Sequence, residues 1–166
     1  MLVNHYSKRI FNLAYQFSGS HPESEDLTQE IFLKLYYTLQ KYDFSKDFTA
    51  WFLTLAKNHL IDHYRKTKWE RTKRDDFNDY YLASTFESPE NRVMKTENQK
   101  IIWKGLNHLS SEIRMVLILR DIQEKTYEEI ATIMDLPLGT IKSRVNRGRL
   151  QLAKILKDKK EKENEV

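Results

Sequence analysis

The chain has 166 residues, of which 40% are hydrophobic and 31% are charged, with a formal net charge of +4. That length allows one domain or two small ones. The absence of cysteine excludes disulfides and cysteine-ligated metal centres and suits a reducing cytoplasm, and no apolar run is long enough for a membrane span or a secretory signal.

Charge is unevenly distributed along the chain. Residues 41–74 and 101–166 are basic, and residues 75–100 between them are acidic. Two basic segments separated by an acidic one suggest two nucleic-acid contacts on one chain.

Two helices are expected in the first forty residues. The first has a helical repeat of apolar residues and should end near Gly19, and it is interpreted as structural. The second begins around Pro22, which the first turn of a helix tolerates. Its buried side should carry Leu27, Ile31, Phe32, Leu35 and Leu39, and its opposite side Asp26, Gln29, Glu30, Leu33 and Tyr37. An acidic face is usually only solvated, so these residues alone favour that interpretation over a partner surface.

A turn at residues 42–47 should lead into a long helix from about Phe48 to Lys66. Trp51, Asn58, Asp62 and Arg65 fall on one stripe of this helix, beside an apolar arc of Phe52, Ala56, Leu60 and Tyr64. A tryptophan in line with an amide and an arginine suits stacking on unpaired bases. The alternative is that Trp51 is a core residue and that Asp62 and Arg65 form a weak surface pair, and spacing does not decide between the two.

The segment His59 to His63 reads HLIDH and raises the question of a metal site. Histidines four residues apart share a helix face, but a third ligand is missing nearby, and aspartate replaces the glutamate of the inverted zinc-hydrolase motif. No metal and no catalytic residue is therefore expected.

The middle of the chain changes from basic to acidic and polar. Residues 67–74 remain basic, and a flexible linker is expected at 75–92, which contains Ser84, Thr85, Ser88 and Pro89. Helical spacing resumes at Val93, and Ser110 can cap a further helix. The charged tail from Asp158 to Val166 is expected to be frayed.

Residues 125–156 predict two helices that meet at a tight turn. Thr126 and Glu129 have the spacing of a capping box, and Pro137 stops the first helix. A second helix from about Leu138 should bury Leu138, Ile141, Val145, Leu152 and Leu156, and should present Thr140, Ser143, Arg144, Arg147 and Lys154 on the opposite arc. This helix carries no acid before Asp158. The pattern favours a DNA-reading helix-turn-helix over an ordinary amphipathic helix with a solvated basic face.

Three segments in this order resemble conserved regions of a known family. EDLTQEIFLKLY is similar to a polymerase-binding helix, FTAWFLTLAKNHLIDHYRK to a melting and minus-ten-recognition helix, and TYEEIATIMDLPLGTIKSRVNRGR to a minus-thirty-five reader. Together they resemble bacterial sigma factors of the extracytoplasmic-function (ECF) type, which carry only regions two and four. The resemblance covers nearly the whole chain.

The resemblance implies roles for individual residues. Polymerase binding is implied for Asp26, Gln29, Glu30 and Leu33; minus-ten contacts for Phe44, Ser45, Lys46, Trp51, Asn58, Asp62 and Arg65; and minus-thirty-five contacts for Thr140, Lys142, Ser143, Arg144, Asn146 and Arg147. It also implies an all-α fold with a region-two domain (1–74), the linker (75–92) and a region-four domain (93–166).

Partners and function follow from the same resemblance. The expected partners are the clamp helices and flap of core RNA polymerase, promoter DNA, and an anti-sigma factor that can be membrane-bound. The chain itself is expected to be a cytoplasmic monomer without cofactor. Two other classes stay open: a stand-alone dimeric repressor or activator that reads duplex half-sites, and a metal hydrolase built on HLIDH.

The sequence departs from the family pattern at three positions. Thr49 stands where many relatives have arginine, which weakens any phosphate contact there. Asp135 replaces the usual turn glycine, and aspartate tolerates left-handed backbone geometry better than most residues. Gly148 replaces a common alanine on the packing side of its helix, where it permits closer approach at a propensity cost of about 1 kcal/mol.

Overall fold

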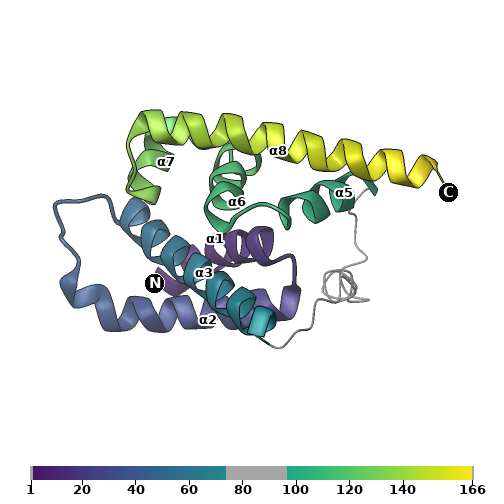
Figure 1. The fold of residues 1–166 in the computed structure, drawn as a ribbon. Coiled ribbons are helices and arrows are strands. Elements are labelled where there is room, and N and C mark those ends of the chain that lie inside the picture. Colours follow the sequence, from purple (N-terminus) through teal and green to yellow (C-terminus); the bar gives the residue numbers. More distant parts are fainter. Residues whose placement is uncertain (1, 74–96, 166) are drawn as a thin grey trace.

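The computed structural model describes residues 2–73 and 97–165, and these contain helices and no strand. The N-terminal half consists of α1 (Leu2–Ser18), α2 (His21–Thr38), the short 3₁₀ helix η1 (Leu39–Lys41) and α3 (Phe48–Lys73) (Figure 1). The expected all-α class is confirmed. Among the described residues, no helix is long and apolar enough to cross a membrane.

The C-terminal half begins with α5 (Glu97–Leu106) and α6 (Ser111–Leu117), which continues into a π-helical turn, η3 (Ile118–Ile122). It ends with α7 (Tyr127–Met134) and α8 (Leu138–Asn164), the two helices of the predicted helix-turn-helix. The side chain of Ser110 accepts a hydrogen bond from the Ile113 amide, which confirms the predicted cap of α6.

The helices of the N-terminal half pack around the apolar positions that the sequence pattern predicts. Gly19 has a φ of 74°, which a residue with a side chain rarely adopts, and it turns the chain from α1 into α2. Ser20 then caps α2 by accepting from the Glu23 amide. The core between the three helices is formed by fully buried Ile10, Leu13, Leu27, Ile31, Phe52 and Leu60.

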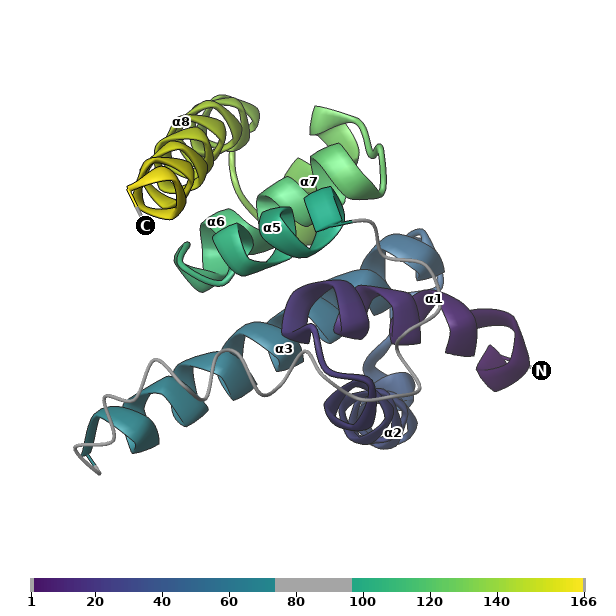
Figure 2. The same ribbon diagram turned by 90° about the vertical axis from the view of Figure 1, so that its right-hand side faces the viewer.

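The two halves are in contact with each other. Figures 1 and 2 both place α5 to α8 on one side of α1 to α3, with α3 against α6 and α7. Leu53, Lys57 and Ile61 are buried on α3. Nothing in the sequence pattern predicted that the two halves would pack together.

Two helix boundaries and the burial of one residue differ from the prediction. Helix α3 runs to Lys73 instead of Lys66, because residues 67–73 contain no helix breaker and the Thr67 hydroxyl donates to the carbonyl of His63. Helix α8 runs to Asn164, so the expectation of a frayed tail from Asp158 is wrong. Leu138 is 36% exposed at the first turn of α8, although it was expected on the buried arc. The linker at 75–92 lies outside the described residues.

Candidate nucleic-acid and protein interfaces

The outward face of α2 combines polar groups with a large apolar area. Leu33 is 58% exposed, and Tyr36 and Tyr37, about one turn further along, are 75% and 74% exposed. The remaining residues predicted for this face, Asp26, Gln29 and Glu30, are also exposed. Isolated exposed apolar residues are ordinary, but several on one helix face mark an interaction surface.

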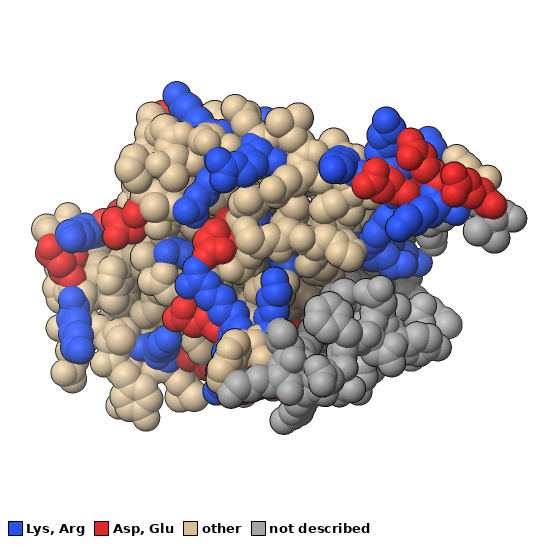
Figure 3. All heavy atoms as spheres, in the orientation of Figure 1, with Lys and Arg blue, Asp and Glu red and all other residues tan. Residues whose placement is uncertain are grey.

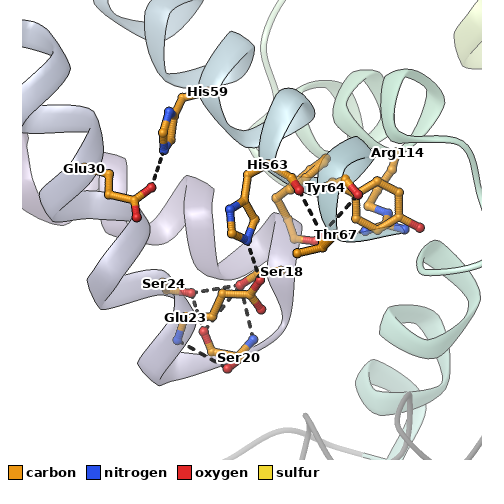
Figure 4. A network of polar contacts seen from close by, with 11 residues as sticks. Ser18, Ser20, Glu23, Ser24, Glu30, His59, His63, Tyr64, Thr67 and Arg114 are labelled. Carbon is orange, nitrogen blue, oxygen red and sulfur yellow. Dashed lines mark hydrogen bonds and ion pairs between the residues drawn. The ribbon is translucent and has the colours of Figure 1, made fainter. Parts of the chain in front are cut away.

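Two histidine–glutamate contacts pin α3 to α2 (Figure 4). His59 Nε2 lies 2.7 Å from Glu30 Oε2, and His63 Nε2 lies 3.1 Å from Glu23 Oε1. The hydrogen bond to Glu23 raises the pKa of His63, against the opposing effect of burial. The two histidines of HLIDH thus face different carboxylates, and no group of three or more ligating side chains gathers in the part of the chain that the structure describes.

A cluster of aromatic rings joins the loop at residues 42–47 to Trp51. The Tyr42 ring lies 5.1 Å from that of Phe44 and 4.9 Å from that of Trp51, measured between ring centres. The Asp43 carboxylate accepts from both the amide and the hydroxyl of Ser45, which shapes the loop and lowers the pKa of Asp43. Phe44 is 88% exposed at the tip. The structure therefore brings the loop and Trp51 together through the ring of Tyr42.

The stripe on α3 faces outward between α2 and α6. Asn58, Asp62 and Arg65 are exposed, and Trp51 is half-buried against Phe48. Spacing left two interpretations of Trp51. The ring is half-buried and packs against the core, and its stacking on bases stays a prediction. The alternative pairing of Asp62 with Arg65 is wrong, because Arg65 forms an ion pair with Glu112 of α6.

Lys57 lies beside this stripe but is buried, and its ammonium group donates to the Asn58 side chain at 2.5 Å. Burial lowers the pKa of Lys57, and the charges of Asp135 and Asp62 oppose that shift. Lys57 therefore holds the amide of Asn58 in place.

Arg114 on α6 is 2% exposed and ties the two halves together. Its guanidinium donates to the carbonyls of Leu106 at 3.0 Å, Asn107 at 2.9 Å and, across to α1, Phe17 at 3.3 Å. The guanidinium carbon also lies 4.2 Å from the ring centre of Tyr64 on α3. Burial lowers the pKa of Arg114, but arginine remains charged in proteins, so this group works as a fixed cation among backbone dipoles.

The turn between α7 and α8 has the predicted geometry. Thr126 accepts from the Glu129 amide while the Glu129 carboxylate accepts from the Thr126 amide, which completes the capping box and lowers the pKa of Glu129. Asp135 has a φ of 53° and ends α7 in the left-handed conformation. Ile141 and Val145 are buried, which fixes the rotation of α8.

The close packing of α8 depends on a glycine. A methyl group added at Gly148 would lie 2.7 Å from the side chain of Ile113, so the glycine lets α8 approach α6. The expectation from the sequence that Gly148 permits close approach is therefore confirmed.

The rotation of α8 presents a polar and basic surface to solvent. Lys142, Ser143, Asn146 and Arg147 are exposed, and Thr140 and Arg144 are half-buried. Arg149 is held differently, because its guanidinium donates twice to the Asp121 carboxylate, at 2.5 and 3.1 Å. Figure 3 shows Lys and Arg side chains over α3 and along α8, with acidic side chains among them at the C-terminal end of α8.

Sequence reasoning missed Arg114, Lys57 and Arg149. A signal existed for Arg114, since it is the single charged residue among the apolar positions of residues 113–119. A lone arginine in a buried segment requires several acceptors nearby. A similar signal existed for Lys57, which is the single Lys, Arg, Asp or Glu in residues 48–61. Arg149 gave no such signal, because it lies among the other basic residues of its helix.

Comparisons with known proteins find two family regions along the chain. The family model described as Sigma-70 region 2 matches residues 2–70, and the one described as Sigma-70, region 4 matches residues 99–152. The ECF RNA polymerase sigma factor SigW of Bacillus subtilis is 31% identical, over 95% of this chain and 88% of its own length. The ECF RNA polymerase sigma-E factor of Escherichia coli K12 is 30% identical, over 90% of this chain and 81% of its own length.

Solved structures share the arrangement of both halves. The sigma factor RpoE in complex with the anti-sigma factor NepR from Bartonella quintana has a TM-score of 0.70 and 28% identity, over 93% of this chain and 94% of that chain. CnrH in complex with the cytosolic domain of CnrY has a TM-score of 0.66 over 95% of this chain and 86% of that one; at 20% identity this likeness concerns the fold.

Proposed function

Because the chain belongs to the ECF group of RNA polymerase sigma factors, which serve promoter-specific transcription initiation, we propose that its two halves read two promoter elements in different states. The C-terminal half reads the minus-thirty-five element as duplex, and the N-terminal half reads the minus-ten element as unpaired bases. The observation that carries the proposal is that one chain presents an exposed aromatic loop beside Trp51 and, separately, a basic helix-turn-helix.

The minus-ten surface consists of the loop residues Phe44, Ser45 and Lys46 with Trp51, continued along α3 by Asn58, Asp62 and Arg65. An exposed ring can stack on a flipped base, which contributes about 1–3 kcal/mol and is available only when the base is unpaired. The loop therefore favours the open form of the promoter by its differential affinity for the two states. This is differential binding, and it requires no catalytic residue.

The minus-thirty-five surface consists of Thr140, Lys142, Ser143, Arg144, Asn146 and Arg147 on α8. Hydroxyl, amide and guanidinium groups of this kind contact base edges and phosphates in the major groove. Arg149 contributes by holding α8 to Asp121, so we assign it a positioning role. The C-terminal half would also meet the polymerase flap.

The face of α2 formed by Asp26, Gln29, Glu30 and Leu33 would dock on the clamp helices of the largest polymerase subunit. Leu33 and the neighbouring Tyr36 and Tyr37 supply exposed apolar area, and the carboxylates of this face supply charge that selects the partner. Glu30 also accepts from His59, so this face is fixed relative to α3.

Reading both elements at once requires the two halves to separate. The element names place them about 25 base pairs apart, which is roughly 85 Å at about 3.4 Å per base pair. Helix α8, with 27 residues, is only about 40 Å long, and α3 contacts α7 directly. We therefore interpret the described arrangement as the form without DNA. A tether at 75–92 between domains 1–74 and 93–166 would permit the opening.

An anti-sigma factor is the further partner that we propose. RpoE is seen with NepR, and this chain shares its arrangement over nearly its whole length. A protein that binds the packed arrangement would keep the halves from separating and so prevent initiation. The free chain would be a monomer in the cytoplasm, where RNA polymerase transcribes.

Transcription with core polymerase tests the proposal. Purified chain is added to sigma-free core enzyme with a library of promoter fragments, and transcripts are sequenced. The double variant Asp26→Ala with Leu33→Ala should lose most transcription, whereas Glu161→Ala, which removes another exposed carboxylate at the far end of α8, should not. Glu30 is avoided because it also holds His59. The absence of any promoter-dependent transcript from the wild-type chain would refute the proposed function.

A further inference from the structure

The two histidines of HLIDH, which take no part in the proposed DNA contacts, both face α2 (Figure 4). His59 contacts Glu30 and His63 contacts Glu23, so the two contacts are of the same kind and join the same two helices. Their places on α2 differ. Glu30 belongs to the exposed face of α2, and its side chain is 51% exposed. Glu23 lies about two turns earlier, in the first turn of α2, and is not one of the residues of that face.

His59 has a second neighbour on α2, about one turn beyond Glu30. Its Nδ1 atom lies 3.5 Å from the ammonium nitrogen of Lys34, and its Nε2 atom lies 2.7 Å from the Glu30 carboxylate. An ammonium group can only donate a hydrogen bond, and a carboxylate can only accept one. Nδ1 therefore accepts from Lys34, and the ring carries its proton on Nε2 and donates it to Glu30. The neutral ring of His59 thus bridges the two charged side chains.

The bridge determines what the two charged groups of α2 contact. A glutamate four residues before a lysine has the spacing at which the two side chains pair with each other along a helix. In the structure Glu30 and Lys34 both contact His59 instead, and both residues remain exposed. A side chain that is already held in one conformation loses less entropy when a partner binds it. A protein that docks on this face therefore meets a carboxylate and an ammonium group already in place.

We propose that His59 is a positioning residue for polymerase docking, which holds Glu30 and Lys34 in the arrangement that the clamp helices bind. The inference rests on the proposed function and extends it. It adds Lys34 to the docking face, and it gives a residue of α3, between the proposed DNA contacts Asn58 and Asp62, an effect on the docking face of α2. The side chain of His59 is only 18% exposed, so it acts through its two neighbours.

The test measures the affinity of the labelled full chain for sigma-free core polymerase by fluorescence anisotropy, with no promoter DNA present. His59→Ala should weaken binding about tenfold, because each long side chain that a partner must immobilise lowers affinity by about two- to tenfold. His59→Gln should retain most of the affinity, because a glutamine amide offers an acceptor for Lys34 and a donor for Glu30 and carries no charge. An affinity of His59→Ala equal to that of wild type would overturn the proposal.

His63→Ala is the matched control, since it removes the same kind of histidine–glutamate contact between the same two helices. It should lower the stability of the chain and leave the affinity for core polymerase, per folded molecule, unchanged. A loss of affinity in His63→Ala equal to that in His59→Ala would mean that both histidines only hold α3 against α2, and would overturn the positioning role. A loss in His59→Gln as large as that in His59→Ala would overturn the neutral bridge.

A second comparison shows whether His59 acts through its two neighbours. In a chain that already carries Glu30→Ala and Lys34→Ala, adding His59→Ala should change the affinity for core polymerase by less than about twofold, because the side chains that His59 positions are gone. A further loss as large as that in the wild-type background would refute the proposal. Failure of this inference is distinguishable from failure of the proposed function. In the first case the wild-type chain binds core polymerase and the His59 variants bind equally well, and in the second the wild-type chain does not bind core polymerase.

Discussion

Replacing Arg114 with methionine tests how the two halves are held. Methionine keeps the apolar length of the side chain and removes the guanidinium, which donates to the carbonyls of Leu106, Asn107 and Phe17. The Leu106 carbonyl also accepts from the Leu109 amide, so it would keep one partner. The Phe17 carbonyl belongs to the other half of the molecule, so loss of the hydrogen bond from Arg114 to this carbonyl weakens the contact between the halves.

The expected loss follows from these contacts. A hydrogen bond from a charged donor contributes about 1.5–3 kcal/mol, and an acceptor left buried without a partner costs about 1–3 kcal/mol. Removing the buried charge offsets part of this loss of stability, because a buried ion carries a large desolvation penalty. The free energy of unfolding should therefore fall by about 3 kcal/mol, which is a large part of the ~5–15 kcal/mol of a typical protein.

Urea unfolding followed by circular dichroism measures this change. Arg120→Met is the matched control, since Arg120 is half-buried and donates to one carbonyl, that of Lys125, at 2.8 Å. Its loss should be about 1 kcal/mol, as for an ordinary hydrogen bond. If Arg114→Met unfolds at the same urea concentration as Arg120→Met, then the buried guanidinium does not hold the structure together and the reasoning is wrong.

Three further predictions concern other parts of the molecule. The hydrogen bond to Glu23 raises the pKa of His63, so the stabilisation that this bond gives is fully present below the ordinary pKa of about 6.5 and is lost as pH rises through the raised pKa. The difference in stability between wild type and His63→Gln should therefore be larger at about pH 6 than at about pH 8.5. An equal difference at the two pH values would contradict this prediction. Gly148→Ala should lower the melting temperature, because the added methyl group would lie 2.7 Å from Ile113. Gly139→Ala has open space around the added methyl group and should raise stability by up to about 1 kcal/mol. A Gly148→Ala variant more stable than Gly139→Ala would refute the packing argument. Arg147→Ala should weaken duplex binding at the upstream element by about tenfold. Trp51→Ala should instead reduce the permanganate reactivity of unpaired thymines in the promoter. Reactivity of Trp51→Ala equal to that of wild type would refute this division of roles between the two halves.

The features that sequence predicted well are those decided within one or two helical turns. The capping box of Thr126 and Glu129 and the left-handed Asp135 depend on residues three or four positions apart, and both have the predicted geometry. The outward stripe of Asn58, Asp62 and Arg65 follows from helical periodicity alone. Local rules apply there because the backbone itself brings the interacting groups together.

The features that sequence did not predict depend on residues far apart in the chain. Arg114 donates to a carbonyl 97 positions away, and Gln123 donates to Gln16 over 107 positions. Helix α8 continues past Asp158 after packing against α5, where a methyl group at Gly105 would lie 2.7 Å from Leu152. Periodicity shows which face of a helix is apolar, but not which other helix covers it.

The contact between the halves sets how easily the molecule could open. The ion pair of Arg65 with Glu112 joins side chains that are 59% and 27% exposed, and exposed pairs contribute only about 0–1 kcal/mol. Glu112→Ala should therefore shift the equilibrium between packed and separated halves only slightly. Arg114 is buried, and separation of the halves would break its hydrogen bond to the Phe17 carbonyl and expose the apolar side chains of α3 that the C-terminal half covers.

If polymerase and promoter bind only the separated halves, their binding must supply the free energy of separating the halves. A ligand shifts a conformational equilibrium by no more than its differential affinity for the two forms. A partner that binds only the packed halves acts on the same equilibrium in the opposite direction. Removing about 1.4 kcal/mol from the contact between the halves then raises the ratio of separated to packed molecules tenfold. Arg114→Met should accordingly bind core enzyme more tightly than wild type per folded molecule and an anti-sigma partner more weakly, and a parallel change in both affinities would exclude a shared equilibrium.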